Sequence, residues 1–372
     1  MVLMNPVELT KDLIRLRSVS REGNGEVSDY IETWLRDAGF DEIERLTYEM
    51  DGVEKVNLIA RKGEGTGGLA FLSHSDTVPG EEDAWAAFDP EIRDGRLYGR
   101  GSCDMKGPLA TTMIAAAGID ADKLNAPVYV VVTSDEEIAL RGAEHTVEHS
   151  QILKKHAPTY GVIAEPTSLI PVYAHKGFVR IIVTAHGRSA HSSLDTGISS
   201  NFLIAPFLAD MAEVKQRFMT EQQFQNDEFS PPTNGFNMIL EDNGMSNVTS
   251  SRTVCMMTFR VMPDAAVEEA ISLISEKAEQ YGLDVMVDVN EEPVYIDPSS
   301  ALIQAACAAT DNNNPETVSY GTDGMHFRKI MGLVILGPGD IGVAHTTTEF
   351  VPLAELEKAV DVYRKMIESL CM

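Results

Sequence analysis

Near the start of the chain, apolar residues recur every three to four positions, the spacing that places them on one face of a helix. This pattern predicts a helix over residues 5–19 and a second over residues 26–38, which ends before Gly39. Further helices are expected at residues 106–118 and 138–150.

Short apolar runs separate these helical stretches. Four of them predict strands that are buried on both faces, at residues 68–73, 127–134, 160–164 and 332–336. Buried strands that alternate with helices are typical of a mostly parallel sheet with helices on both faces. This part of the chain is therefore predicted to have an α/β fold.

The middle of the chain has a different pattern. A strand, a helix, two strands, a helix and a strand are predicted at residues 178–186, 199–218, 235–241, 253–262, 264–281 and 283–291. This β-α-β-β-α-β order is that of a ferredoxin-like unit. From Leu283 to Val289, apolar residues alternate with mainly polar ones, as in a half-exposed antiparallel sheet. We therefore expect an α/β domain of residues 1–176 and 292–372, interrupted by an inserted α+β domain of residues 177–291.

Length and charge narrow the class of protein. The chain has 372 residues, with 30 Lys and Arg against 57 Asp and Glu, which gives a formal charge of −27 at pH 7. Such a polyanion repels nucleic acid and anionic membranes, so neither is an expected partner. No apolar run approaches the ~20 residues of a membrane span, and the four cysteines include no C-x-x-C pair. We expect a soluble, cytoplasmic protein without a disulfide framework.

Side chains that can bind metals follow the predicted strands. The four strands are followed in turn by His74 and Asp76, by Glu136 and Glu137, by Glu165, and by His345. Asp104 lies in the loop before the helix at 106–118. Because the carboxyl ends of parallel strands meet at one edge of a sheet, where ligands bind, we expect these side chains to lie together. Two histidines with several carboxylates suit zinc or a similar divalent cation.

Taken singly, such residues carry little weight in so acidic a chain. About nine adjacent acidic pairs are expected by chance at this composition. An isolated histidine is more often a solvated residue than a ligand. The metal hypothesis therefore depends on several strands delivering ligand-type groups to the same edge.

A competing pattern is the H-x-x-E-H sequence from His145 to His149, which matches the helix of single-zinc peptidases. On a helical wheel, Leu140, Ala143 and Val147 form the apolar stripe, and the two histidines lie opposite it. We expect both histidines to face solvent, which favours the strand-end cluster as the metal site.

Five segments together resemble one known family. HSDTVPG, GRGSCDMKG, TSDEE, AEPT and LGPGDIGVAHTTTE occur in this order and resemble the di-zinc amidohydrolases, which include acetylornithine deacetylase, succinyl-diaminopimelate desuccinylase, aminoacylase and carboxypeptidase G. The resemblance covers nearly the whole chain. It implies that the inserted domain is a lid and dimerisation domain, and that the protein is a homodimer.

The resemblance also implies a centre with two divalent metal ions, zinc or alternatively cobalt, that share Asp104. His74 and Glu165 would complete one metal site, and Glu137 and His345 the other. The peptide after Asp104 tends to be cis in this family.

Catalytic and substrate-binding roles follow from the same resemblance. Asp76 would orient His74, and Glu136 would be the general base for a water shared by the metals. His191 matches a lid histidine that reaches an active site, often that of the partner subunit. Positions that match substrate-binding residues are Asn247 and Arg260, expected to hold a substrate carboxylate, and Gly321 and Thr322.

The segments AHKG and LGPG most resemble acetylornithine deacetylase. They imply a small-molecule N-acyl amino acid as substrate, with hydrolysis of N-acetyl-L-ornithine to L-ornithine and acetate. A succinyl-diaminopimelate desuccinylase, a broader aminoacylase and a di- or carboxypeptidase of the same mechanism are the alternatives. A metal-free binding protein on this fold is a more remote one.

Overall fold

The computed structural model describes residues 5–242 and 244–372. The chain forms two units, each built from separate stretches of sequence: unit 1 from Met1–Ala174, Tyr295–Glu316 and Thr322–Met372, and unit 2 from His175–Val294 and Thr317–Gly321. Each unit has its own cluster of buried apolar side chains. The sequence analysis had left Thr317–Gly321 with the larger domain.

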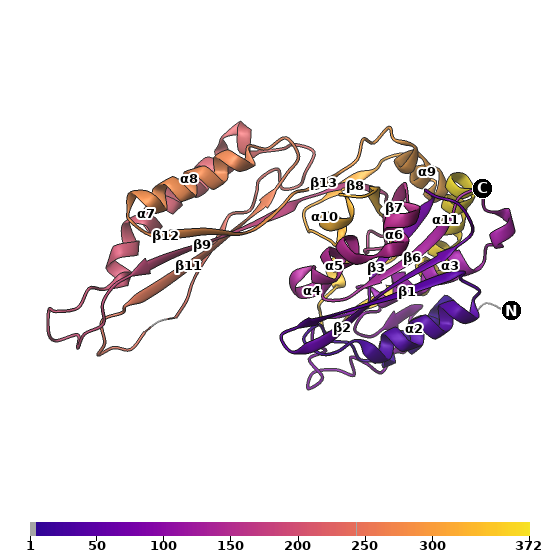
Figure 1. Ribbon diagram of the computed structural model, residues 1–372, viewed down its shortest axis with the longest axis horizontal. Coiled ribbons are helices and arrows are strands. Elements are labelled where there is room, and N and C mark those ends of the chain that lie inside the picture. Colours follow the sequence, from indigo (N-terminus) through magenta and orange to yellow (C-terminus); the bar gives the residue numbers. More distant parts are fainter. Residues whose placement is uncertain (1–4, 243) are drawn as a thin grey trace. The chain divides into compact units, whose positions relative to one another are not determined.

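The main sheet of unit 1 has the strand order β1-β2-β6-β3-β7-β15-β8-β13, and β14 pairs with β8 (Figure 1). A small second sheet has the order β16-β5-β4. The strands of both sheets are β1 (Glu42–Met50), β2 (Val53–Lys62), β3 (Leu69–His74), β4 (Glu91–Arg93), β5 (Arg96–Tyr98), β6 (Val128–Thr133), β7 (Tyr160–Ile163), β8 (Val172–His175), β13 (Val294–Tyr295), β14 (Glu316–Val318), β15 (Gly332–Ile335) and β16 (Phe350–Pro352).

The four predicted buried strands are β3, β6, β7 and β15, and they form the parallel centre of the main sheet. Every residue of β3 and β6 is buried. The antiparallel hairpin β1–β2 at the sheet edge was not predicted, although its turn has a sequence signal. Asp51-Gly52 both have positive φ, 53° and 79°, as the common Asp-Gly hairpin turn requires. The predicted α/β class with a mostly parallel centre is confirmed.

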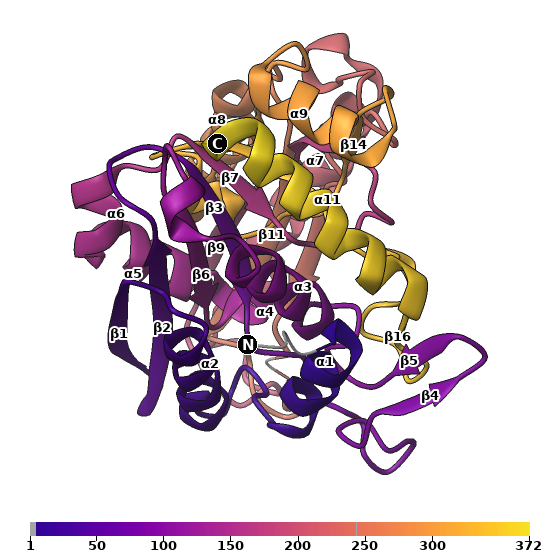
Figure 2. The ribbon, with the colours of Figure 1, turned by 90° about the vertical axis from the view of Figure 1, so that its right-hand side faces the viewer.

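Helices cover both faces of the main sheet, with α3 and α11 on one side of the strands and α5 and α6 on the other (Figure 2). The helices of unit 1 are α1 (Pro6–Arg15), α2 (Gly25–Asp37), α3 (Lys106–Ala117), η1 (Ala121–Lys123), α4 (Glu136–Ala139), α5 (Arg141–His149), α6 (Gln151–His156), α9 (Ala301–Thr310), α10 (Gly324–Phe327), η3 (Ile341–Val343) and α11 (Leu353–Cys371). α3 is buried from Lys106 to Ala116 because it packs against α1, α11, β3 and β6.

Two helices differ from their predicted limits. α1 ends at Arg15 rather than at residue 19, because Val19 instead forms a parallel bridge with Thr77 beyond the end of β3. The helix predicted at 138–150 is interrupted at Leu140, whose φ of 56° is left-handed, so α4 and α5 are separate.

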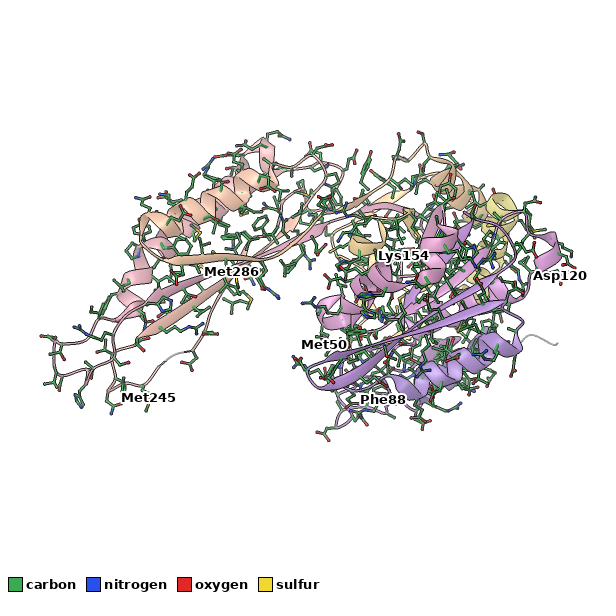
Figure 3. The ribbon with its side chains drawn as sticks, in the orientation of Figure 1. Met50, Phe88, Asp120, Lys154, Met245 and Met286 are labelled. Atoms are coloured by element: carbon green, nitrogen blue, oxygen red, sulfur yellow. The ribbon has the colours of Figure 1, made fainter. Side chains whose placement is uncertain are left out.

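Unit 2 has the predicted β-α-β-β-α-β order. Its elements are β9 (Gly177–His186), α7 (Ser200–Thr220), η2 (Gln222–Phe224), β10 (Asn237–Leu240), β11 (Arg252–Val261), α8 (Val267–Gln280) and β12 (Asp284–Glu291). The sheet is antiparallel, in the order β10-β11-β9-β12, and shares a core with α7 and α8. The alternation predicted for β12 holds at Leu283, Val285 and Val289 but fails at Val287, which is exposed next to a register shift between Val287 and Val289. Met286, labelled in Figure 3, is exposed as the alternation predicts.

Among the described residues, no helix combines the length and the apolar character needed to cross a membrane.

Candidate metal centre and catalytic residues

The predicted site residues of unit 1 meet at one edge of the main sheet. β6, β3 and β7 lie side by side and parallel, so their carboxyl ends share that edge. β3 ends with His74 in the middle of the edge. Glu136 and Glu137 follow β6 on one side of it, and Glu165 follows β7 on the other. β15 is next to β7, and the chain continues from it through η3 to His345.

One group of candidate metal ligands consists of His74, Asp104 and Glu165, all of them buried. Nε2 of His74 lies 3.2 Å from Oδ1 of Asp104 and 3.6 Å from Oε1 of Glu165. Nδ1 on the other side of the ring lies 3.0 Å from the backbone oxygen of Asp76 and 3.4 Å from its Oδ1. Asp76 therefore holds the ring with Nε2 directed at two carboxylates.

The second group consists of Asp104, Glu137 and His345. Nε2 of His345 lies 3.1 Å from Oδ2 of Asp104 and 2.9 Å from Oε2 of Glu137. The two oxygens of Asp104 thus face different histidines, and a carboxylate in this arrangement can bridge two cations. The His345 side chain is 51% exposed, so the centre is open to solvent on this side. The peptide between Asp104 and Met105 is cis, as the resemblance implied.

Asp76 also fixes the backbone that carries the two glutamates. Its Oδ1 accepts a hydrogen bond from the amide of Glu136 at 3.3 Å, and its Oδ2 accepts one from the amide of Glu137 at 3.4 Å. The hydroxyl of Ser20 donates a third hydrogen bond to Oδ2 at 2.7 Å. One buried carboxylate therefore sets the positions of His74 and of both glutamates.

Glu136 and Glu137 lie in the first turn of α4, so the helical backbone begins two residues before the helix expected at 138–150. The preceding residue, Asp135, has a left-handed φ of 59° and turns the chain from β6 into this helical turn. Its carboxylate lies 2.7 Å from Nζ of Lys55 and accepts a hydrogen bond from the Tyr48 hydroxyl at 2.7 Å. Since successive helical residues are about 100° apart, the two glutamate side chains point in different directions.

The centre holds an excess of buried negative charge. Burial raises the pKa of Glu136 well above its usual range, against the nearby charge of His74, and the carboxylate of Glu165 raises it further. Burial likewise raises the pKa of Glu137 and of Glu165. Hydrogen bonds to Asp104 and Glu137 raise the pKa of His345 to about 10. In the absence of a metal, the histidine nitrogens hold protons tightly, and a bound cation would replace these protons.

This donor set fits two divalent cations. Each group offers one imidazole nitrogen and two carboxylate oxygens that lie within 4.8 Å of one another. In addition, the buried Oε1 of Glu137 has no hydrogen-bond partner within the described parts of the chain. Mixed nitrogen and oxygen donors of this kind are the usual ligands of catalytic zinc.

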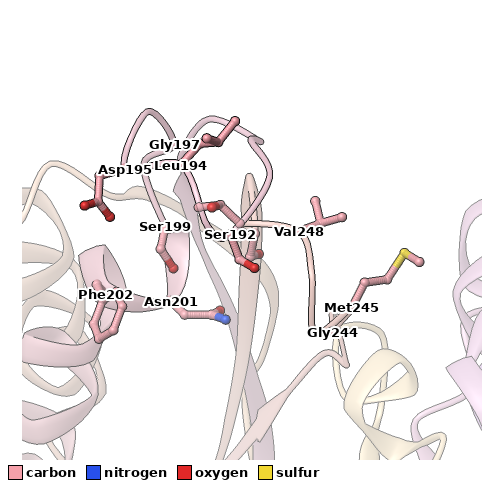
Figure 4. A pocket seen from close by; sticks show the side chains of 12 residues that line it. Ser192, Leu194, Asp195, Gly197, Ser199, Asn201, Phe202, Gly244, Met245 and Val248 are labelled. Atoms are coloured by element: carbon pink, nitrogen blue, oxygen red, sulfur yellow. The ribbon is translucent and has the colours of Figure 1, made fainter.

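His191 and Asn247 lie in neighbouring loops of unit 2. His191 forms an isolated bridge with Val248, and the backbone oxygen of Asn247 accepts a hydrogen bond from the amide of Ser192 at 3.1 Å. The His191 ring is exposed, and its Nδ1 lies 2.7 Å from the hydroxyl of Ser193. A cavity of about 430 Å³ lies beside these loops (Figure 4).

Arg260 lies near the opposite end of β11 from those loops. It is eight positions beyond Arg252, where β11 begins, or about 26 Å at the rise of a strand. Its guanidinium lies 5.3 Å from the ring centroid of Phe178, and burial lowers its pKa. Asn247 and Arg260 of one copy are therefore too far apart to hold the same substrate carboxylate, and their roles in substrate binding stay a prediction.

The two remaining predicted positions lie at the boundary between the units. Gly321 belongs to unit 2, and Thr322, which begins the last segment of unit 1, is buried. The next residue, Asp323, is a buried acid that the sequence analysis missed, although it lies in the segment GTDGMHF. Its Oδ2 accepts a hydrogen bond from the Thr133 hydroxyl at 2.5 Å, and its Oδ1 has no hydrogen-bond partner among the described residues. Burial raises its pKa to about 7.

Comparison with known proteins settles the family. The model of peptidase family M20/M25/M40 matches residues 70–369, which is most of the chain.

The chain belongs to peptidase family M20/M25/M40.

One relative and two solved structures resemble the chain over nearly their whole length. An acetylornithine deacetylase from Myxococcus xanthus is 32% identical, over 97% of this chain and 96% of the relative. The M20 family metallo-carboxypeptidase Sso-CP2 from Sulfolobus solfataricus shares the fold, with a TM-score of 0.74, 16% identity, and coverage of 98% of this chain and 99% of that one. So does the YXEP protein of Bacillus subtilis, a dinuclear metal binding peptidase, with a TM-score of 0.65, 15% identity, and coverage of 97% and 96%.

As a member of the M20/M25/M40 family, the protein is a hydrolase, and it carries two groups of candidate metal ligands that share Asp104.

The H-x-x-E-H helix of this M20/M25/M40 member provides no group of three candidate ligands among the described residues. His149 is exposed, but His145 is half-buried and stacks on Tyr48 with 4.9 Å between ring centroids. Burial also lowers the pKa of His145. The expectation that both histidines face solvent is wrong for His145, because the unpredicted strand β1 packs against α5.

Two buried ion pairs near the centre were not predicted. Lys55 pairs with Asp135, and Arg100 pairs with Glu349. The partners are far apart in sequence, and neither pair has a local motif that would have revealed it.

Proposed function

We propose that this enzyme hydrolyses N-acetyl-L-ornithine to L-ornithine and acetate. Supporting this substrate is the likeness to acetylornithine deacetylases, which extends over almost the full length of both chains. The observation that carries the proposed chemistry is the geometry of Asp104, whose two oxygens face His74 and His345 beside a half-buried Glu136.

Glu136 is the proposed general base and then the general acid. It takes a proton from the attacking water and returns that proton to the departing amine. A carboxyl group whose pKa is raised by burial suits this role, because it can hold the proton between the two steps. Asp76 fixes the amide of Glu136 and so keeps this carboxyl group in place.

The proposed cofactor is a pair of zinc ions, with cobalt as the alternative. His74, Asp104 and Glu165 would hold one ion, and Asp104, Glu137 and His345 the other. When bound, such ions polarise the amide carbonyl and lower the pKa of water.

A homodimer formed through unit 2 is part of the proposal. The edge strand β10 is exposed from Asn237 to Leu240, and such an edge can pair with another chain. Phe202 on α7 is 83% exposed. In a dimer, His191 would act at the partner's centre, which accords with its distance from Arg260 along β11. The four cysteines, all buried and free, support a reducing, cytoplasmic location.

The substrate is tested by measuring amine release from N-acetyl-L-ornithine, N-succinyl-diaminopimelate and N-acetyl-methionine at equal concentrations. We expect the highest kcat/KM with N-acetyl-L-ornithine. A much higher kcat/KM for either of the others would overturn the proposed substrate and leave the mechanism in place.

The role of Glu136 is tested with the isosteric variant Glu136→Gln. We expect kcat to fall by at least about 10²- to 10⁴-fold, since the variant cannot carry the proton. Metal content, measured by elemental analysis, should stay at the wild-type value. Glu148→Gln, at an exposed position of α5, is the matched control and should keep full activity. Turnover by Glu136→Gln at the wild-type rate would exclude Glu136 as the base.

A further inference from the structure

Asp104 is a candidate bridge only while its backbone is held in one place, and the structure shows what holds it. Oε1 of Glu349 accepts hydrogen bonds from two consecutive backbone amides, those of Cys103 at 3.0 Å and Asp104 at 3.1 Å. The Glu349 side chain is completely buried. An acceptor for two successive amides fixes the orientation of the peptide between them.

A buried cation holds the other oxygen of Glu349. Nη1 of Arg100 donates to Oε2 at 2.6 Å, and the Arg100 side chain is only 1% exposed. Nε of Arg100 donates to the backbone oxygen of Pro79 at 3.2 Å, and its guanidinium lies 5.6 Å from the ring centroid of Trp85. These contacts leave the carboxylate of Glu349 little freedom to rotate away from the two amides.

Glu349 also joins two loops that carry different ligands. It lies four residues after His345 and directly before β16, and its backbone oxygen accepts a hydrogen bond from the amide of Gly99 at 3.3 Å. β16 pairs with β5, which enters the Asp104 loop. Glu349 therefore connects the loop that supplies Asp104 with the segment that supplies His345.

We propose that Glu349, held by Arg100, is the positioning residue that keeps both oxygens of Asp104 directed at the two metal sites. This inference rests on the proposed dinuclear centre. Glu349 makes no contact with the reacting atoms in this account and acts only through the backbone of Asp104. Residues that orient metal ligands in this way typically change metal affinity about 10- to 100-fold when they are replaced.

The test measures cobalt binding to metal-free protein by calorimetry and by the visible absorption of bound cobalt, which reports coordination geometry. In Glu349→Gln, the amide nitrogen of the new side chain would face the Arg100 guanidinium, donor against donor, or would face the two backbone amides. We expect at least one cobalt ion to bind about 10- to 100-fold more weakly, with an altered spectrum. We also expect a lower kcat at saturating cobalt.

The matched control is Glu44→Gln. The Glu44 carboxylate also accepts hydrogen bonds from two successive amides, those of Gln151 and Ile152, but it belongs to neither candidate ligand group. This variant should bind cobalt with wild-type affinity and spectrum. Glu349→Asp keeps the charge but is one methylene shorter, so it cannot reach Arg100 and both amides together. Its cobalt affinity should also fall, and it serves as the deciding variant if Glu349→Gln does not fold.

Unchanged cobalt affinity and spectrum in a folded Glu349 variant, with only a lower melting temperature, would overturn the inference, since Glu349 would then be purely structural. Failure of wild-type protein to bind two equivalents of cobalt would instead overturn the proposed dinuclear centre. The two failures are therefore distinguishable.

Discussion

At the scale of single residues, the centre is a cluster of acids that the fold forces out of water. Asp76, Asp104, Glu165 and Asp323 are each at most 5% exposed. Placing several carboxylates in a dry site is costly unless protons, hydrogen bonds or cations compensate them. Asp323 shows this most directly, because its only compensation among the contacts described above is the Thr133 hydroxyl.

The pH dependence of Asp323 gives a prediction for the metal-free protein. The folded state raises the pKa of Asp323 from 3.8 to about 7, so the folded state binds its proton more tightly than the unfolded state does. Ionisation of Asp323 therefore lowers the free energy of unfolding as the pH rises from about 4 to 7, and the whole of this destabilisation is present above pH 7. Asp323→Asn should remove this penalty and stabilise the metal-free protein at pH 8, by at most about 4 kcal/mol.

The measurement is thermal unfolding in chelator at pH 5 and pH 8, where the stabilisation should be clearly smaller at pH 5. Asp51→Asn, in the exposed β1–β2 turn, is the control and should behave alike at both values. An equal effect of Asp323→Asn at the two pH values would contradict the assignment.

At the scale of elements, the pattern of hydrophobic residues was sufficient to predict a helix or strand wherever that element buries one regular face. It located β3, β6, β7 and β15 and each helix and strand of unit 2 to within a few residues. It failed where conformation depends on one backbone angle or on a distant partner. Leu140 splits a helix that its side-chain pattern continues, and β1 is recognisable only once β2 is known to pair with it.

The residues of the candidate site also divide into those that the sequence predicts and those that it does not. The strand-end rule selected His74, Glu137, Glu165 and His345, because they follow strands that the pattern reveals, and the resemblance selected Asp104 as the residue they share. Asp323 and Glu349 could not be selected, since their partners Thr133 and Arg100 are 190 and 249 positions away in the sequence. Tertiary contacts of that separation have no local signal.

The junction between the Asp104 loop and α3 gives a prediction at this scale. A Cβ on Gly107 would lie 2.2 Å from the backbone oxygen of Ser102, which is far inside contact distance. Gly107→Ala should therefore displace the loop, destabilise the protein by roughly 1–3 kcal/mol and weaken retention of metal during dialysis.

The control is Gly25→Ala at the first residue of α2, where a Cβ would meet nothing within 4 Å. We expect it to be neutral or slightly stabilising, because alanine favours helix. Thermal unfolding and metal analysis of both variants decide the matter, and equal behaviour of the two would argue against a tight junction at Gly107.

At the scale of the whole molecule, chemistry and the proposed dimer contacts belong to different units. Both groups of candidate ligands lie in unit 1, whereas His191, Asn247 and Arg260 lie in unit 2. The length of β11 separates the His191 loop from Arg260. In the proposed dimer, His191 and Arg260 of one copy would therefore serve different centres.

Subunit complementation tests this arrangement. Glu136→Gln and His191→Ala should each be nearly inactive alone. If His191 acts at the partner's centre, a mixed dimer has one complete centre, and mixing the two variants after reversible dissociation should restore roughly a quarter of wild-type activity. No recovery, despite mixed dimers demonstrated by differently tagged chains, would show that His191 acts within its own chain.

The order of the ligands along the chain has a consequence for biosynthesis. The first candidate ligands, from His74 to Glu165, precede unit 2, whereas His345 follows it. A nascent polypeptide can therefore contain the main part of unit 2, His175–Val294, while the second of the proposed metal sites still lacks its histidine. If two ions bind as proposed, translation products that end before residue 345 would lack a ligand of the second ion and should be inactive.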